Sequence, residues 1–139
     1  MDIADACIAI RERMEGQWNT SDAPLVWPNE TPPVMDAPSP VIHMDIVGGD
    51  ERVRGYGGGP GQNRWRQSGE IVIRVLIPSG KGADAARALG ATAAAIFRGA
   101  KFSGIHCGGA AMNAGTEEDS EGNWFEVVRI VPFEFDFIG

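Results

Sequence analysis

The segment EIVIRVLIPSGKGADAARALGATAAAIFRG, residues 70–99, places a strand, a turn and a helix one after another. Residues 70–77 are rich in β-branched side chains and are apolar on both faces apart from Arg74, which is typical of a central strand covered on one side by helix. A Pro-Ser-Gly turn then stops the strand. Residues 83–98 carry apolar side chains at helical spacing, with Asp84 in the first turn and a glycine after the last. Because the helix face is rich in alanine, the segment predicts a helix packed closely on a sheet.

A second helical pattern lies at the beginning of the chain, over residues 2–15. Apolar side chains recur there at i, i+3, i+4, i+7 and i+11, which makes one helical stripe. We expect Asp2 to cap this helix and Gly16 to end it. The stripe consists of Ile3, Ala6, Cys7, Ile10 and Met14.

Four further segments have the patterns of strands. Residues 25–27 form a short apolar run that ends at a proline, and residues 41–47 alternate between apolar and polar side chains. Residues 101–114 are interrupted by glycines. Residues 124–138 alternate over a long stretch, where Pro132 predicts a bulge or an unpaired edge near the middle.

The remaining segments predict loops. Residues 28–40 are rich in proline, and residues 48–68 contain a glycine cluster that we expect to exclude a packed element. Residues 116–123 form an acidic turn. The predicted fold is therefore α+β: one small domain over residues 1–139, with two helices and a mixed or antiparallel sheet of about four to five strands, in the order α-β-β-β-α-β-β.

Composition and charge narrow the classes of protein to consider. The 139 residues carry a formal net charge of −7, which argues against a protein that holds nucleic acid by its phosphates. Only two cysteines are present, so neither a disulfide framework nor a zinc site is expected. The sequence predicts neither a signal peptide nor a membrane span, and we expect a protein of a reducing compartment, the cytoplasm.

Two glycine-rich segments invite comparison with phosphate-binding loops. Residues 55–61 precede a strand, whereas a dinucleotide fingerprint precedes a helix. Residues 79–82 do lie between strand and helix, but Val75 stands where a P-loop has its first glycine and Gly82 where it has a hydroxyl. The favoured interpretation of residues 55–61 is a mobile or interface-forming loop, and that of residues 79–82 is a plain strand-to-helix turn. An anion or nucleotide site at residues 79–82 is the rival hypothesis.

The residues that usually carry catalysis show no recognisable arrangement. His106 and Cys107 are adjacent in a predicted strand, so their side chains point to opposite faces and do not share a proton. The acidic residues 117–121 lack the ligand spacing of a calcium loop. We therefore predict no catalytic residue, no metal site and no cofactor, and a protein that is not an enzyme.

The segment from residue 48 to residue 68 is the predicted interaction surface. It combines arginines with aromatic residues, the types that are enriched at protein interfaces, on a stretch that lacks a core of its own. Nearby acidic side chains and the net charge argue against nucleic acid as the partner. The predicted interface residues are Arg52, Arg54, Tyr56, Arg64, Trp65 and Arg66.

Several short motifs follow one another along nearly the whole chain. They are an N-terminal helix, Val26-Trp27-Pro28-Asn29-Glu30, Pro32-Pro33, a loop ending at Arg66 and Gly69, Ile71-Val72-Ile73-Arg74-Val75 leading into Pro78-Ser79-Gly80-Lys81-Gly82, an Ala-rich helix closing with Phe97-Arg98-Gly99, and a final strand from Trp124-Phe125 to Pro132-Phe133. In this order they resemble the tail terminator or tail-completion proteins of long-tailed bacteriophages and related tail-like particles. The glycine cluster from Tyr56 to Gly61 departs from the family's pattern by its length.

The resemblance implies a structural virion protein at the junction of tail and neck, assembled in the host cytoplasm. Six copies form a homo-oligomeric ring that caps the tail tube protein, stops its polymerisation and joins the neck or head-completion connector. DNA then passes through the ring without specific binding, and no membrane is involved. An acidic channel lining, for which Glu117, Glu118 and Asp119 are the candidates, would repel DNA phosphates. The alternatives are another head-tail joining or head-completion protein and a small anion- or nucleotide-binding enzyme.

Overall fold

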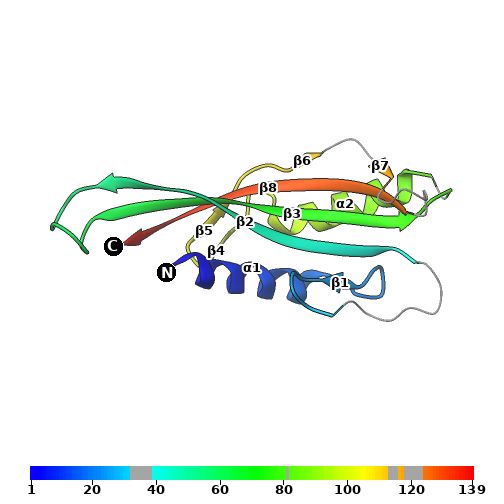
Figure 1. Ribbon diagram of the computed structural model, residues 1–139, viewed down its shortest axis with the longest axis horizontal. Helices are drawn as coiled ribbons and strands as arrows, with labels where there is room; N and C mark the ends of the chain where they lie inside the picture. The colour runs from blue at the N-terminus through cyan, green and yellow to red at the C-terminus, as the bar shows by residue number, and fades with distance from the viewer. Residues whose placement is uncertain (32–38, 81, 113–115, 118–123) are drawn as a thin grey trace.

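The computed structural model describes residues 1–31, 39–80, 82–112, 116–117 and 124–139, with backbone only for residues 116–117. Two helices lie on one face of a sheet whose strands follow the order β1-β2-β3-β8-β5-β4, while β6 and β7 also pair with β8 (Figure 1). The elements in chain order are α1 (Ile3–Gln17), β1 (Leu25–Val26), β2 (Val41–Gly55), β3 (Arg64–Pro78), α2 (Asp84–Phe97), β4 (Lys101–Phe102), β5 (Ile105–Cys107), β6 (Ala111–Met112), β7 (Thr116–Glu117) and β8 (Trp124–Ile138).

Three strands of 15 residues each, β2, β3 and β8, make up most of the sheet. Strand β3 lies between the other two and pairs with both in antiparallel fashion, with β8 in unbroken register from Arg64↔Ile138 to Pro78↔Trp124. At about 3.3 Å per residue, strands of this length extend for roughly 50 Å. Figure 1 shows that they twist around one another along this length.

Both predicted helices are present, close to the predicted bounds. Asp2 caps α1 in a reciprocal capping box with Asp5, as a helix start of this type requires. The predicted end at Gly16 is wrong, because α1 continues through Gln17 and ends at Trp18. Trp18 is buried and its indole N–H donates to the Ala23 carbonyl, so tertiary packing sets the end of the helix. Among the described helices, neither is long and apolar enough to cross a membrane.

The hydrophobic core lies between the two helices and one face of the sheet. Side chains from α1, such as Ile10, and from α2, such as Phe97, join the alternate residues of β3 in one buried cluster. On β3 these residues are Ile71, Ile73, Val75 and Ile77. Burial of such large apolar side chains contributes about 1.5–3 kcal/mol each to folding. The intervening residues of β3, beginning with Glu70, belong to the opposite face, which neither helix covers.

The predicted sheet of about four to five strands is wrong, because the described residues alone form a sheet of eight strands. The α+β character holds, yet the sheet dominates the fold. Within the predicted strand at residues 101–114 the structure has three short strands, β4, β5 and β6, and β7 lies in the predicted acidic turn. Each has only two or three residues, and β5, β6 and β7 pair with the edge of β8. Strands of two or three residues are too short to show a periodicity in the sequence. They form because their backbone groups pair with a neighbouring strand.

The predicted loop at residues 48–68 is also wrong over most of its length. Strand β2 continues to Gly55 and β3 begins at Arg64, so only residues 56–63 connect them. Two register shifts, between Gly48 and Glu51 and between Val53 and Gly55, accommodate the irregular segment as bulges. Backbone pairing needs no side chains, and the glycines therefore did not prevent a strand. Of the predicted loop at residues 28–40, residues 32–38 lie outside the described part of the chain.

The sequence predicts a bulge or an unpaired edge at Pro132, but the register with β3 is unbroken there, and Pro132 lies between the two segments of β8 that pair with β5 and with β6. It faces Glu70 of β3 in register, while its carbonyl accepts from the Gly108 N–H on the other side. Its nitrogen therefore points away from β3, toward the gap between β5 and β6, where a donor is not needed for pairing.

Candidate interaction site

The far end of the β2–β3 hairpin and the end of β8 form a three-stranded projection, which we call the arm (residues 50–68 and 134–139). Figure 1 shows the arm extending beyond the end of α1, with the C-terminus beside it. Five of the six residues predicted as interface residues lie on its strands, and Tyr56 begins the turn at its tip. The sequence assigned these residues to a loop, whereas the structure places five of them on paired strands.

Asp136 holds the arm together from its β8 strand. Its carboxylate accepts from the guanidinium of Arg66 at 2.7 Å and from that of Arg64, both on β3. A second carboxylate, Glu134, lies 3.6 Å from Arg66. The hydrogen bonds from Arg66 and then Arg64 hold the pKa of Asp136 well below its usual range. The four side chains form a neutral cluster, so Arg64 and Arg66 are already paired within their own chain.

Trp65 fastens the C-terminus to the other face of the arm. Its indole N–H donates to the Gly139 carbonyl at 3.0 Å, and its cross-strand partner is Phe137. Asn63 and Gly139 also exchange two backbone hydrogen bonds, of 3.0 and 2.9 Å. The indole is therefore half-buried in its own subunit.

Arg52, Arg54 and Tyr56 are the predicted interface residues that remain available to a partner. Tyr56 is 82% exposed, the largest exposure among the described large hydrophobic side chains. Arg52 has only a loose ion pair with Asp50, at 3.6 Å, and both side chains are almost fully in solvent. Arg54 is exposed and makes no ion pair with any described residue. Exposed aromatic and arginine side chains without internal partners are the chemistry of a contact surface.

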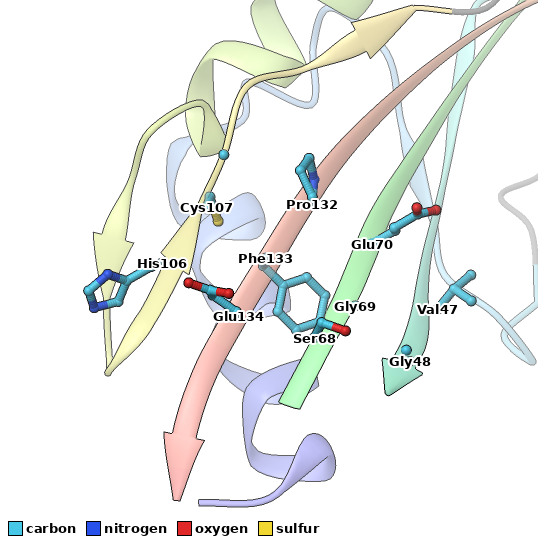
Figure 2. A pocket seen from close by; sticks show the side chains of 12 residues that line it. Val47, Gly48, Ser68, Gly69, Glu70, His106, Cys107, Pro132, Phe133 and Glu134 are labelled. Atoms are coloured by element: carbon cyan, nitrogen blue, oxygen red, sulfur yellow. The ribbon is translucent and has the colours of Figure 1, made fainter. Parts of the chain in front are cut away.

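A hollow of about 670 Å³ lies at the base of the arm, where β2, β3, β8 and β5 meet (Figure 2). Glycines of several strands line it, and the walls on the uncovered face include Glu70, Pro132, Glu134 and His106. Gly69 faces Phe133, whose ring would lie 2.5 Å from a Cβ at that position. Sequence reasoning missed this hollow because its lining comes from four separate segments. The glycines that line it are Gly48, Gly49, Gly69 and Gly108.

The hollow offers shape rather than reactive groups. Burial raises the pKa of the Cys107 thiol to about 11, so the thiol stays protonated at neutral pH and is a poor nucleophile. His106 is exposed and lies opposite Glu134. Over the described residues, no three histidine, cysteine or acidic side chains gather as a metal ion requires.

The turn at residues 79–82, the rival anion site, has few groups to hold an anion. Gly80 and Gly82 adopt positive φ, which explains the glycines by backbone conformation. Ala83 precedes α2 without a side-chain cap, and the buried Ser79 hydroxyl has no hydrogen-bond partner within the described part of the chain. Lys81, the one cation of the motif, lies outside the described residues.

The acidic residues predicted to line a channel are mostly outside the described chain. Glu117 belongs to β7, where it pairs with Phe125 through the backbone. Glu118 and Asp119 lie outside the described residues. Strand β7 places Glu117 beside the end of β8 that is remote from the arm.

Comparison with known proteins identifies the fold and leaves the family open. No protein-family model and no curated protein matches the chain. The chain is similar to a solved structure of a protein known only by a sequence identifier, with a TM-score of 0.60 and 18% sequence identity. The match covers 94% of this chain and 95% of that chain, so it extends over the whole fold. At this level of identity the likeness concerns the fold alone.

Proposed function

We propose that this protein is the tail terminator of a long-tailed bacteriophage or a related tail-like particle. In this role copies of the chain form a ring of six, which caps the tail tube protein and joins the neck or head-completion connector. The chain acts through the surfaces that it presents, without catalysis or cofactor. DNA passes through the ring without specific binding, in keeping with the formal net charge of −7.

The arm is the observation that carries the proposal. It projects beyond the helical layer (Figure 1), and among the described residues Arg54 and Tyr56 near its tip are exposed. A ring subunit needs two different complementary surfaces, since head-to-tail contacts close only when the patches differ. A projecting arm and the body of the next subunit supply such a pair, and Tyr56 and Arg54 give the arm the side chains that dominate interfaces.

The size of the ring and its place in a particle test the proposal. Light scattering of the purified protein should give the mass of a closed oligomer, and negative-stain electron microscopy should show rings. Antibody labelling of assembled particles should then mark the junction of tail and neck. A protein that stays monomeric at every concentration, or a label at another site, would contradict the proposal; a label on the head side of the neck would indicate a head-completion protein instead.

The rival hypothesis of an anion-binding enzyme has a separate test. Calorimetric titration with ATP, GTP and inorganic phosphate should show no micromolar binding if the turn at residues 79–82 is structural. Saturable binding that is lost on replacing Ser79 by Ala would favour the enzyme.

A further inference from the structure

Two strand edges of the arm have no partner among the described residues. The outer edge of β2 pairs only with β1, and only at Ile42 and His43, although β2 continues to Gly55. The outer edge of β8 pairs with β5 at Phe133 and Glu134, and no described strand covers it beyond that point. The arm is thus a ribbon of three strands with an open edge on each side. Open edges are templates for pairing with another chain unless charge, proline or a bulge protects them.

Two features protect the outer edge of β2 from pairing with another chain in its part nearest the helices: the Asp45 side chain and the bulge after Gly48. The Asp45 carboxylate accepts from the Ile46 N–H at 2.8 Å, directly after the end of β1. The register shift between Gly48 and Glu51 then interrupts the edge. Beyond this bulge, residues 51–53 return to regular pairing with β3 before the second register shift, between Val53 and Gly55, so their outer edge is the part that fits an incoming strand.

The charges across the arm favour one order of strands over the others. Arg52 of β2, Arg66 of β3 and Asp136 of β8 lie side by side in register, a row that reads plus, plus, minus. Like charges directly opposite each other destabilise a sheet, and Arg52 lacks a close counter-charge. If β8 of one copy lay beside β2 of the next, each Asp136 would stand between Arg66 of its own chain and Arg52 of the neighbour.

The other two edge pairings would oppose like charges. Two β2 edges side by side would bring Arg52 against Arg52, and two β8 edges would bring Asp136 against Asp136. The row on the opposite face gives the same preference. It reads Val53, Trp65, Phe137, so a neighbouring β2 would place Val53 against Phe137 and continue an apolar stripe.

We propose that the sheet continues from one subunit to the next, with the edge of β2 at residues 51–53 paired in parallel with the edge of β8 at residues 135–137 of a second copy. Strands β2 and β8 are both antiparallel to β3, and are therefore parallel to each other, so a rotation about an axis along the arm preserves this direction. The contact is head-to-tail, the type that closes a ring. The inference rests on the proposed function and names the interface that it needs.

Engineered cysteines test the pairing directly. In a background in which Cys7 and Cys107 are replaced by Ser, we would combine Arg54→Cys with Ile138→Cys, two exposed positions on the two edges. Strand β3 separates them within one chain, at roughly 10 Å, whereas a disulfide requires Cα atoms within about 7 Å. Oxidation should therefore link different copies, and a non-reducing gel should show a ladder that extends beyond the dimer.

The controls separate this interface from other contacts. Each single-cysteine variant should give no ladder, and Ile8→Cys combined with Ile138→Cys, which places the partner on an exposed position of α1, should also give none. Dimers from Arg54→Cys alone would show β2 edges meeting each other and would overturn the pairing. Oligomers in light scattering without a ladder would overturn the pairing while leaving the ring intact, whereas a monomer would overturn the proposed function itself.

Charge reversal supplies a second readout in the unmodified background. Arg52→Glu should raise the concentration at which the oligomer half-assembles by about tenfold, because it places a carboxylate beside Asp136 of the neighbour. Arg98→Glu reverses an equally exposed charge after α2 and should change that concentration less than about twofold. Equal effects of the two reversals would contradict the inference.

Discussion

At the scale of single residues, Asp136 shows that composition alone does not tell whether an arginine is free to bind a partner or is already paired within its own chain. Arginine and tryptophan on a segment without a core indicated a surface for a partner, yet Arg64, Arg66 and Trp65 bind within their own chain. The sequence contained the partner, Asp136, but 70 residues separate it from Arg66. Only the pairing of β3 with β8 brings the two together.

The ion pairs of Asp136 make the stability of the arm dependent on pH. Because the pKa of Asp136 is lower in the folded chain than in the unfolded one, its contribution is present above the unfolded pKa, about 3.9, and is lost as the pH falls through the folded value. We expect Asp136→Asn to lower the Tm by a few degrees at pH 7. The difference from the wild type should shrink between about pH 4 and pH 2 in thermal melts, and a difference that persists unchanged at pH 2 would contradict this origin.

Gly69 is a residue whose substitution should damage the sheet from within. A Cβ there would lie 2.5 Å from the ring of Phe133 and 2.8 Å from the Val47 carbonyl, and the backbone of β2 cannot yield easily. We expect Gly69→Ala to lower the free energy of unfolding by about 1–3 kcal/mol, measured by urea denaturation. Gly109→Ala is the matched control, since a Cβ at that position meets nothing within 4 Å. Equal losses in the two variants would show that the close approach to Phe133 is not the cause.

At the scale of elements, the length of a strand decides whether the periodicity of the sequence predicts it. Residues 124–138 alternate over their full length, and β8 has those same bounds. Strands β4, β6 and β7 have two residues each, too few for a period, and they form because backbone groups meet a neighbouring edge. In residues 48–55 the glycines indicated a loop. The segment is a strand because β3 continues beside it, and two register shifts accommodate its irregular parts.

The arm should loosen as a unit when its internal contacts are removed. Replacing Arg64, Trp65 and Arg66 together by Ala removes the ion pairs with Asp136 and the hydrogen bond to Gly139. Hydrogen exchange should then accelerate in residues 50–68 and 134–139, while the amides of α1 and α2 keep their protection, since the helices pack on another part of the sheet. Acceleration throughout the chain would show that the arm is part of the cooperative core.

At the scale of the whole molecule, the uneven covering of the sheet gives the protein its two surfaces. The helices bury one face near the middle of the sheet, and the arm projects past them with both edges open (Figure 1). This arrangement suits a subunit that is stable by itself and still has surface left for its neighbours. The fold match over 94% of the chain describes the same whole-chain architecture in another protein.

The proposed channel gives a prediction at this scale. Replacing Glu117, Glu118 and Asp119 by Lys reverses three charges and should make the lumen attractive to DNA phosphates, so that DNA passage slows while rings still assemble. Infectivity of particles carrying the variant, with electron microscopy of the rings as control, measures the effect. Normal infectivity would contradict the prediction that these three residues line the channel.

The sequence by itself determined the two helices, the full length of β8 and the parts of β2 and β3 outside the arm, because each of these features repeats with a period or capping pattern that is local to the chain. The tertiary structure decided the number of strands, the hollow at the base of the arm and the internal pairing of Arg64 and Arg66. These depend on contacts between segments far apart along the chain, such as β3 with β8, and hydrogen bonds between backbones carry no signature in the side chains.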